Sequence, residues 1–183
     1  MAIIESIRGE YERYKKLAES AMAQIDEERL SAAPSAESNS IAMICWHVSG
    51  NLKSRFTDFL TSDGEKPWRK REEEFDARTV SCADLLAKWE DGWGALFAAL
   101  ATLSDDALEK QVTIRGQAVS VLEALHRSLA HTSYHVGQIV YLAKEEAGAG
   151  WTSLSIPKGQ SAAFNQNPSG QKPHEHVARL RGK

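Results

Sequence analysis

The 183-residue chain has 42% hydrophobic and 26% charged residues, the ordinary balance of one soluble domain. Its net charge of -3, with acids and bases interleaved, excludes a basic stripe that could follow a phosphate backbone, so we expect no nucleic-acid partner. No run approaches the roughly 18 apolar residues of a membrane span, and the first residues carry charges where a signal peptide is apolar. We therefore expect a cytoplasmic protein with no membrane partner.

Two helices are predicted in the first third of the chain. Over residues 4–25, apolar side chains recur at steps of three and four between charged ones, which indicates an amphipathic helix. Residues 31–38 break this pattern, and Asn39 or Ser40 can cap a second helix that ends near Ser62.

A long connection is predicted between the second and third helices. Residues 63–79 are charged, contain a proline and show no sustained periodicity. Ser81 and Asp84 then form a capping-box signature, and the apolar face that follows runs on to Leu103 in spite of two glycines. A connection of this length favours a crossover over a simple up-and-down order of helices.

The last helix of the bundle is preceded by a short alternating segment. Residues 112–119 alternate around a glycine and predict a small hairpin. Ser120 and Glu123 form a second capping box, from which a fourth helix can run to about Glu146.

The predicted fold class is therefore all-α: a four-helix bundle with a long connection between helices two and three and an extended C-terminal arm. Beyond residue 151 a few large apolar side chains lie among Ser, Gly, Asn and Gln, without a helical stripe. We expect residues 1–165 to form one domain with the arm packed on it, and residues 166–183 to form a flexible tail.

Three histidines are the candidate metal ligands. On a helical projection, His131 and His135 lie one turn apart at the margin of the buried face, where two imidazoles can reach one cation. His47 borders the buried stripe of the second helix and can supply a third ligand. His126 points away from the pair, and Cys45 lies on a different side of its helix from His47, so both are excluded.

A structural role for these histidines is the alternative. Pairs with this spacing arise by chance in many helices, and a histidine at the edge of an apolar face is commonly a hydrogen-bonded core residue. If they bind a cation, three neutral imidazoles leave a position open, as in catalytic sites. Imidazole ligands favour Zn, with Ni, Fe, Mn or Co as alternatives.

The sequence around the histidines resembles a known family. The strings ICWHVSGNL at residues 44–52 and HTSYHVGQI at residues 131–139 look like the DinB-like (YfiT-related) superfamily of metal-binding four-helix bundles. The string WTSLSIPKGQS at residues 151–161 is similar to the ending of one uncharacterised bacterial branch of that superfamily. The similarity extends from the first helix to about Asn165.

This resemblance implies a bundle, often a homodimer, with a divalent cation held by His47, His131 and His135. Members with known activity include enzymes that use bacillithiol, mycothiol or glutathione, so the resemblance implies a small-molecule substrate such as a low-molecular-weight thiol. A metal-dependent thiol S-transferase or hydrolase is then the first hypothesis. The alternatives are a non-catalytic metal-binding or stress-response protein, and a dimeric interaction module with structural histidines.

Other side chains near the histidines have weaker signals. Each metal-bound imidazole usually donates its second N–H to an acceptor. The candidate acceptors are Ser128, Asn51, Gln138 and Glu10. Arg115 and Lys158 could bind an anionic group of a substrate, although solvated surface charge is the commoner role. The sequence indicates no fourth protein ligand and no general base.

Overall fold

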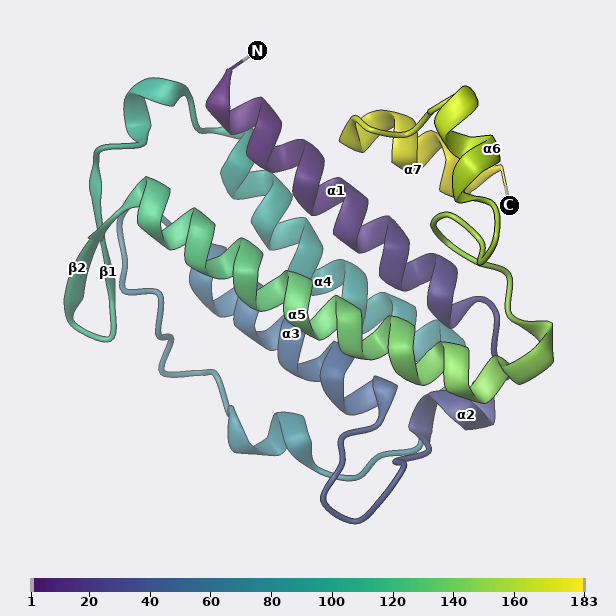
Figure 1. Cartoon of the computed structure of the whole chain (residues 1–183). Helices are drawn as coiled ribbons and strands as arrows, with labels where there is room; N and C mark the ends of the chain where they lie inside the picture. The colour runs from purple at the N-terminus through teal and green to yellow at the C-terminus, as the bar shows by residue number, and fades with distance from the viewer. Residues whose placement is uncertain (1, 183) are drawn as a thin grey trace.

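Four long helices build the fold, in agreement with the predicted all-α class. The computed structural model describes residues 2–182 (Figure 1). Its long helices are α1 (Ile3–Met22), α3 (Ile41–Phe56), α4 (Cys82–Ala101) and α5 (Val121–Ala147). None of the helices described combines the length and apolar character that crossing a bilayer requires.

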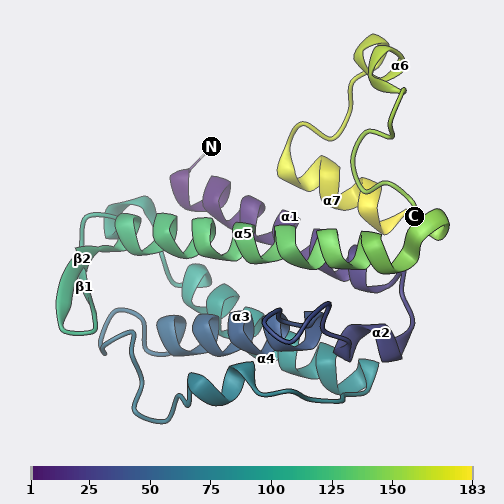
Figure 2. The ribbon, with the colours of Figure 1, turned by 60° about the horizontal axis from the view of Figure 1, so that its bottom comes forward.

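The long connection between α3 and α4 returns along the bundle. As Figures 1 and 2 show, it begins at the hairpin end of α3 and leads back to the other end, so α3 and α4 run in the same direction. The predicted crossover is therefore present. The connection contains the 3-10 turn η1 (Glu72–Phe75), which packs against α3 and so brings connection residues to the helix of His47.

Serine caps begin three of the four long helices. In each, the serine hydroxyl accepts the backbone N–H three residues later, which satisfies a donor that the helix leaves free. The capping residues are Ser40, Ser81 and Ser120. Helix α1 is capped by a residue distant in the sequence: the carboxylate of Asp105 accepts the backbone N–H groups of Ile3 and Ile4 at 2.9 and 3.0 Å.

The predicted hairpin consists of β1 (Gln111–Ile114) and β2 (Gln117–Ser120), paired antiparallel. Its turn residues Arg115 and Gly116 have φ values of 53° and 72°, as a tight two-residue hairpin turn requires. The Asp63 carboxylate accepts the backbone N–H groups of both turn residues, at 2.9 and 2.8 Å. This contact fixes the tip of the hairpin to the start of the long connection.

Helices α3 and α4 approach each other closely at a glycine. A Cβ atom added to Gly92 would lie 2.5 Å from the Cα and the carbonyl oxygen of Ser49. On either side of this contact, Trp89 and Trp93 are fully buried, and the Trp93 ring packs edge-on against Tyr11 of α1 at 6.2 Å. The core therefore contains large aromatic side chains next to one point where the backbones of α3 and α4 are in close contact.

The second predicted helix ends earlier than expected, at Phe56 instead of near Ser62. Thr57 is already extended and Asp58 has a φ of 50°, a left-handed conformation that aspartate tolerates. A further difference is the short helix α2 (Glu27–Ser31), which packs against α3 and buries Leu30.

The C-terminal segment, expected as an extended arm followed by a flexible tail from residue 166, contains two helices, α6 (Ser161–Gln166) and α7 (Pro173–Arg181). Helix α7 lies along α1 (Figure 2) and begins with a proline at its first turn, where the missing N–H costs nothing. Its buried side chains include Val177 and Leu180. With only nine residues, its apolar face is too short for a clear helical period in the sequence.

Candidate metal centre

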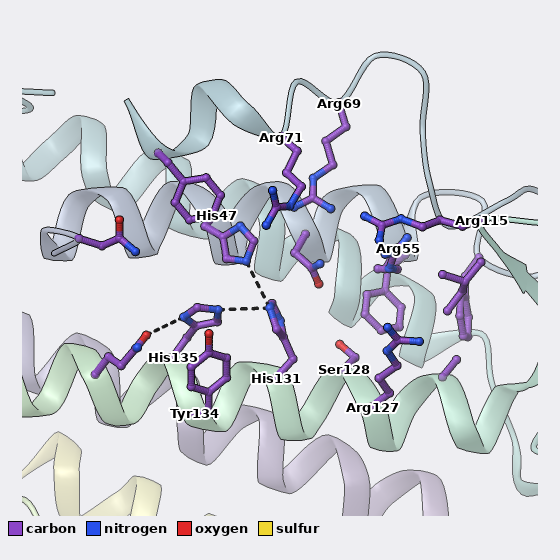
Figure 3. A pocket seen from close by; sticks show the side chains of 18 residues that line it. His47, Arg55, Arg69, Arg71, Arg115, Arg127, Ser128, His131, Tyr134 and His135 are labelled. Carbon is purple, nitrogen blue, oxygen red and sulfur yellow. Dashed lines mark hydrogen bonds between the residues drawn. The ribbon is translucent and has the colours of Figure 1, made fainter. Parts of the chain in front are cut away.

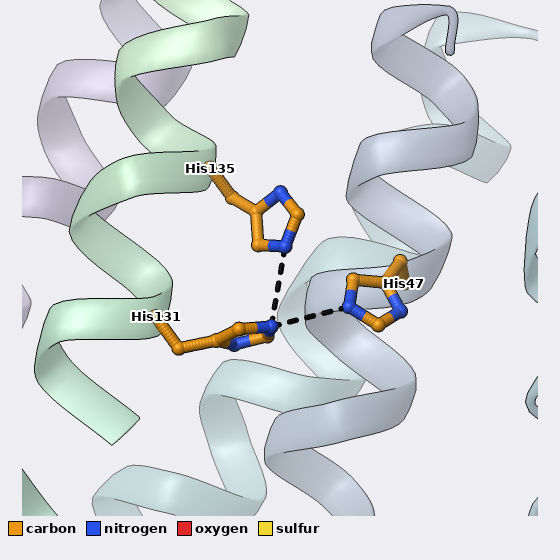
Figure 4. A group of neighbouring side chains, drawn as sticks. All are labelled: His47, His131 and His135. Atoms are coloured by element: carbon orange, nitrogen blue, oxygen red, sulfur yellow. Dashed lines mark hydrogen bonds between the residues drawn. The ribbon is translucent and has the colours of Figure 1, made fainter. Parts of the chain in front are cut away.

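The three predicted histidines come together between α3 and α5 (Figure 4). The Nε2 atom of His131 lies 3.2 Å from Nε2 of His47 and 3.2 Å from Nε2 of His135. One ring nitrogen from each lies within 4.8 Å of the other two. His126, which the helical projection excludes, is exposed on another side of α5.

Two of the three nitrogen–nitrogen distances in the cluster fit one small cation. With metal–nitrogen distances of about 2.0–2.1 Å, two imidazole nitrogens of a tetrahedral centre lie about 3.3 Å apart. The two Nε2 distances in the structure, 3.2 Å each, are close to that value. The cluster could therefore hold a metal ion.

Hydrogen bonds on the far side of two rings orient them. The Glu74 carboxylate accepts a hydrogen bond from Nδ1 of His47 at 2.9 Å, and Oε1 of Gln138 accepts one from Nδ1 of His135 at 2.8 Å. A neutral imidazole with its proton on Nδ1 carries a lone pair on Nε2. Both lone pairs then point toward His131. A neutral His131 ring has one N–H and can donate it to only one of these lone pairs, whereas a cation can accept both.

Glu74 is itself held by a buried arginine and a glycine. Arg69 donates two hydrogen bonds to its carboxylate at 2.8 Å each, and only 2% of the Arg69 side chain is exposed. Burial acts to raise the pKa of Glu74, but the hydrogen bonds from His47 and Arg69 outweigh it and hold that pKa below its usual value. A Cβ on Gly50 would lie 2.1 Å from Oε1 of Glu74, so the glycine provides the space for this carboxylate.

The imidazoles of His131 and His135 are in the form that binds metal. Burial, together with the smaller effects of the neighbouring His135 and His47, lowers the pKa of His131 to about 4. Burial likewise lowers the pKa of His135 to about 4, against the opposing hydrogen bond to Gln138. Both rings are therefore neutral at pH 7 and can donate a lone pair without first losing a proton.

The histidines line a cavity of about 430 Å³ (Figure 3), a volume suited to a small molecule. Phe56, Phe59 and Phe75 supply part of its apolar wall, and the half-exposed Tyr134 ring packs on His135 with ring centres 4.1 Å apart. The cavity also has a cationic lining. Its arginines are Arg55, Arg69, Arg71, Arg115 and Arg127.

Glu74 and Arg69 were not predicted from the sequence. They lie in the connection, where no periodicity indicates which side chain faces the bundle, and the only signal is a run of three glutamates at residues 72–74. Of the proposed acceptors, Gln138 does bond to a histidine. Glu10 instead pairs with Arg13 on α1 at 2.5 Å.

The remaining candidates divide between the cavity and the surface. Asn51 and Ser128 line the cavity, and within residues 2–182 neither hydrogen-bonds to the three histidines. Arg115 also lines the cavity, whereas Lys158 is exposed and lies outside the cavity wall as described.

Comparisons with known proteins give a family but no activity. No curated protein and no solved structure matches the chain. The model of one family, described as a protein of unknown function (DUF1572), matches residues 1–160, which include all three histidines. The chain therefore belongs to the DUF1572 family.

Proposed function

We propose that the protein is a metal-dependent enzyme that acts on a small molecule, with a divalent cation held by His47, His131 and His135. The observation that carries this proposal is the convergence of three imidazole nitrogens at the wall of a cavity. A site with three histidine ligands keeps a position for substrate, as catalytic sites do. We propose Zn as the ion, with Ni, Fe, Mn or Co as alternatives.

We further propose a relationship to the DinB-like superfamily and a reaction of the thiol S-transferase or hydrolase type. When bound, the cation would act as a Lewis acid and activate a thiol or water nucleophile at neutral pH. The chain's own residues orient the ligands and shape the cavity. Glu74 and Gln138 fix the ring orientations of His47 and His135, and the phenylalanines exclude water from part of the wall.

A second candidate is a protein that binds metal without turnover, in metal handling or stress response. It is favoured by one observation, which is that no aspartate or glutamate is among the residues described as lining the cavity. A nucleophile there would lack a carboxylate as general base. A third candidate, a dimeric interaction module with structural histidines, predicts no bound metal at all.

Metal analysis of untagged protein separates the third candidate from the others. We expect one divalent ion per chain in the wild type, and its loss in His47→Ala and His131→Ala, because each variant removes one of three ligands. His126→Ala is the matched control, since His126 is exposed on the same helix as His131. A wild-type protein purified and reconstituted with Zn that still contains no stoichiometric metal would contradict the proposed site.

Turnover separates the first candidate from the second. Metal-loaded and metal-free protein are mixed with thiols, including bacillithiol, mycothiol and glutathione, and with electrophilic acceptors. Ester and amide substrates test the hydrolase. A rate that requires both the metal and His131 supports an enzyme, and the absence of any metal-dependent rate across both screens supports binding without turnover.

A further inference from the structure

Beyond the histidines, the same cavity ends at a group of three arginines that come from three different elements. Arg55 lies on α3, Arg115 at the tip of the hairpin and Arg127 on α5. Figure 3 shows the three side chains gathered on one side of His131, away from His135. We call Arg55, Arg115 and Arg127 the arginine cluster.

The arginine cluster has more positive charge than nearby carboxylates neutralise. One oxygen of Glu65 is shared by Arg115, at 2.9 Å, and by Arg55, at 3.4 Å. Within residues 2–182, Arg127 has no acidic partner in hydrogen-bonding or ion-pair range. Burial lowers the pKa of Arg55, the neighbouring arginines lower it further, and Glu65 opposes them. The three guanidinium groups therefore share one carboxylate and keep an excess of positive charge.

The backbone at Arg115 is held in a conformation that arginine rarely adopts. Its φ of 53° is in the left-handed region, where a Cβ is unfavourable and Gly, Asn or Asp is usual in such turns. Asp63 fixes the turn by accepting two backbone N–H groups. Unfavourable backbone geometry that the surroundings hold in place is commonly associated with a functional side chain.

The arginine cluster lies at a distance from the histidines that one small molecule can span. Arg127 is one helical turn from His131 on α5, about 6 Å along the axis. Arg55 is two turns from His47 on α3, about 12 Å. A ligand whose two ends lie about 6–12 Å apart could contact both groups within the cavity.

We propose that the arginine cluster binds an oxyanion, a carboxylate or a phosphate, on the same small molecule whose other end reaches the metal centre. The planar guanidinium binds both kinds of oxyanion with paired hydrogen bonds. The link to the metal rests on the proposed function, whereas anion binding by the arginine cluster does not. The inference thus narrows the substrate to an anionic small molecule.

Anion binding is tested on metal-free protein by calorimetric titration with inorganic phosphate and with succinate at low ionic strength. We expect saturable binding of at least one probe, weakened tenfold or more in Arg127→Gln and in Arg115→Gln. Arg8→Gln is the control, because it removes the same charge from the surface of α1. The probe that binds more tightly distinguishes a phosphate from a carboxylate ligand.

Two results would overturn the anion site. One is the absence of saturable binding of either probe to wild-type protein whose circular dichroism and unfolding midpoint are normal. The other is an equal loss of binding in Arg127→Gln and Arg8→Gln, which would indicate an effect of net charge alone. Arg127→Lys adds a second test, because it keeps the charge but loses the paired geometry and should bind with intermediate affinity.

The shared ligand is tested with cobalt-loaded protein, in which thiolate binding gives an absorption band. We expect mercaptosuccinate to bind at least tenfold more tightly than 2-mercaptoethanol, and Arg127→Gln to lose this preference while it keeps its cobalt. A preference retained in Arg127→Gln would overturn the shared ligand. If neither thiol binds cobalt but phosphate still binds the metal-free protein, the thiol reaction fails while the anion site stands.

Discussion

At the level of single residues, the proposed metal site depends on which nitrogen of each imidazole carries its proton. Glu74 and Gln138 each occupy the Nδ1 side of a ring, so the Nε2 lone pairs of His47 and His135 face the centre. His131 lies one turn before His135, and its Nε2 atom lies 3.2 Å from Nε2 of each of the other two rings. The orientations of the His47 and His135 rings are therefore set by residues that would not themselves contact a cation bound by the histidines.

The first prediction concerns Glu74. Replacing it in Glu74→Gln removes the anionic acceptor of His47 and leaves the buried Arg69 without its ion pair. We expect metal affinity to fall about 10–100-fold, the usual cost of losing such a partner. Competition with a chelator of known affinity measures it.

Glu73→Gln is the matched control for this prediction. Glu73 is the preceding residue of the same turn, and its side chain is 61% exposed and pairs with the surface Lys70 at 3.0 Å. Metal affinity should stay at the wild-type value in this variant. If Glu74→Gln and Glu73→Gln bind metal equally well, Glu74 does not position His47.

At the level of elements, the local signals in the sequence predicted the four long helices and the hairpin but not how they meet. Capping-box signatures at Ser81 and Ser120 identified two helix starts, because the bonds that define a cap are made within three residues. The spacing of His131 and His135 was equally local. The contact between η1 and α3 is long-range, and no local pattern indicates that Glu74 faces His47.

The two glycines of α4 illustrate the same limit, and they give the second prediction. From the sequence both only weaken the helix, but in the structure Gly92 touches the backbone of Ser49 while Gly94 has nothing within 4 Å of its missing Cβ. Gly94→Ala should stabilise the protein by up to about 1 kcal/mol through helix propensity. Gly92→Ala should destabilise it by about 1–3 kcal/mol, because backbone atoms at 2.5 Å must move.

Urea unfolding of the two alanine variants and the wild type provides the measurement. The variants make the same chemical change in the same helix, so helix propensity contributes equally to both and the difference between them reports the contact with α3. Equal unfolding free energies for Gly92→Ala and Gly94→Ala would show that the close approach of α3 and α4 is not required.

At the level of the whole molecule, the bundle places neutral histidines where burial disfavours their protonation. Helices α3 and α5 provide the three rings, while the returning connection between α3 and α4 supplies Glu74 from outside the four-helix core. The site therefore forms only when α3, α5 and the connection have all folded together. Protonation of the histidines is coupled to folding, because the rings are largely buried in the folded chain and exposed to water in the unfolded chain.

This coupling gives a pH dependence of stability in the metal-free protein. The folded pKa values of His131 and His135 are lowered to about 4 from an ordinary 6.5. Between these pH values the unfolded chain binds more protons than the folded one, so stability falls as pH decreases from about 6.5 toward 4. Urea unfolding at pH 7.5, 6.5, 5.5 and 4.5 should show a steady loss across that window.

The double variant His131→Gln, His135→Gln isolates this effect from that of the carboxylates. Acid also protonates groups such as Glu74, whose lowered pKa makes the stability it contributes disappear as pH falls through its folded value. The double variant retains that carboxylate but has lost two of the rings, so its stability should change less between pH 6.5 and 4.5 than that of the wild type. Parallel pH profiles for the two proteins would mean that the fold does not hold these histidines neutral. Protons would then compete with a metal ion for the two ring nitrogens at mildly acidic pH.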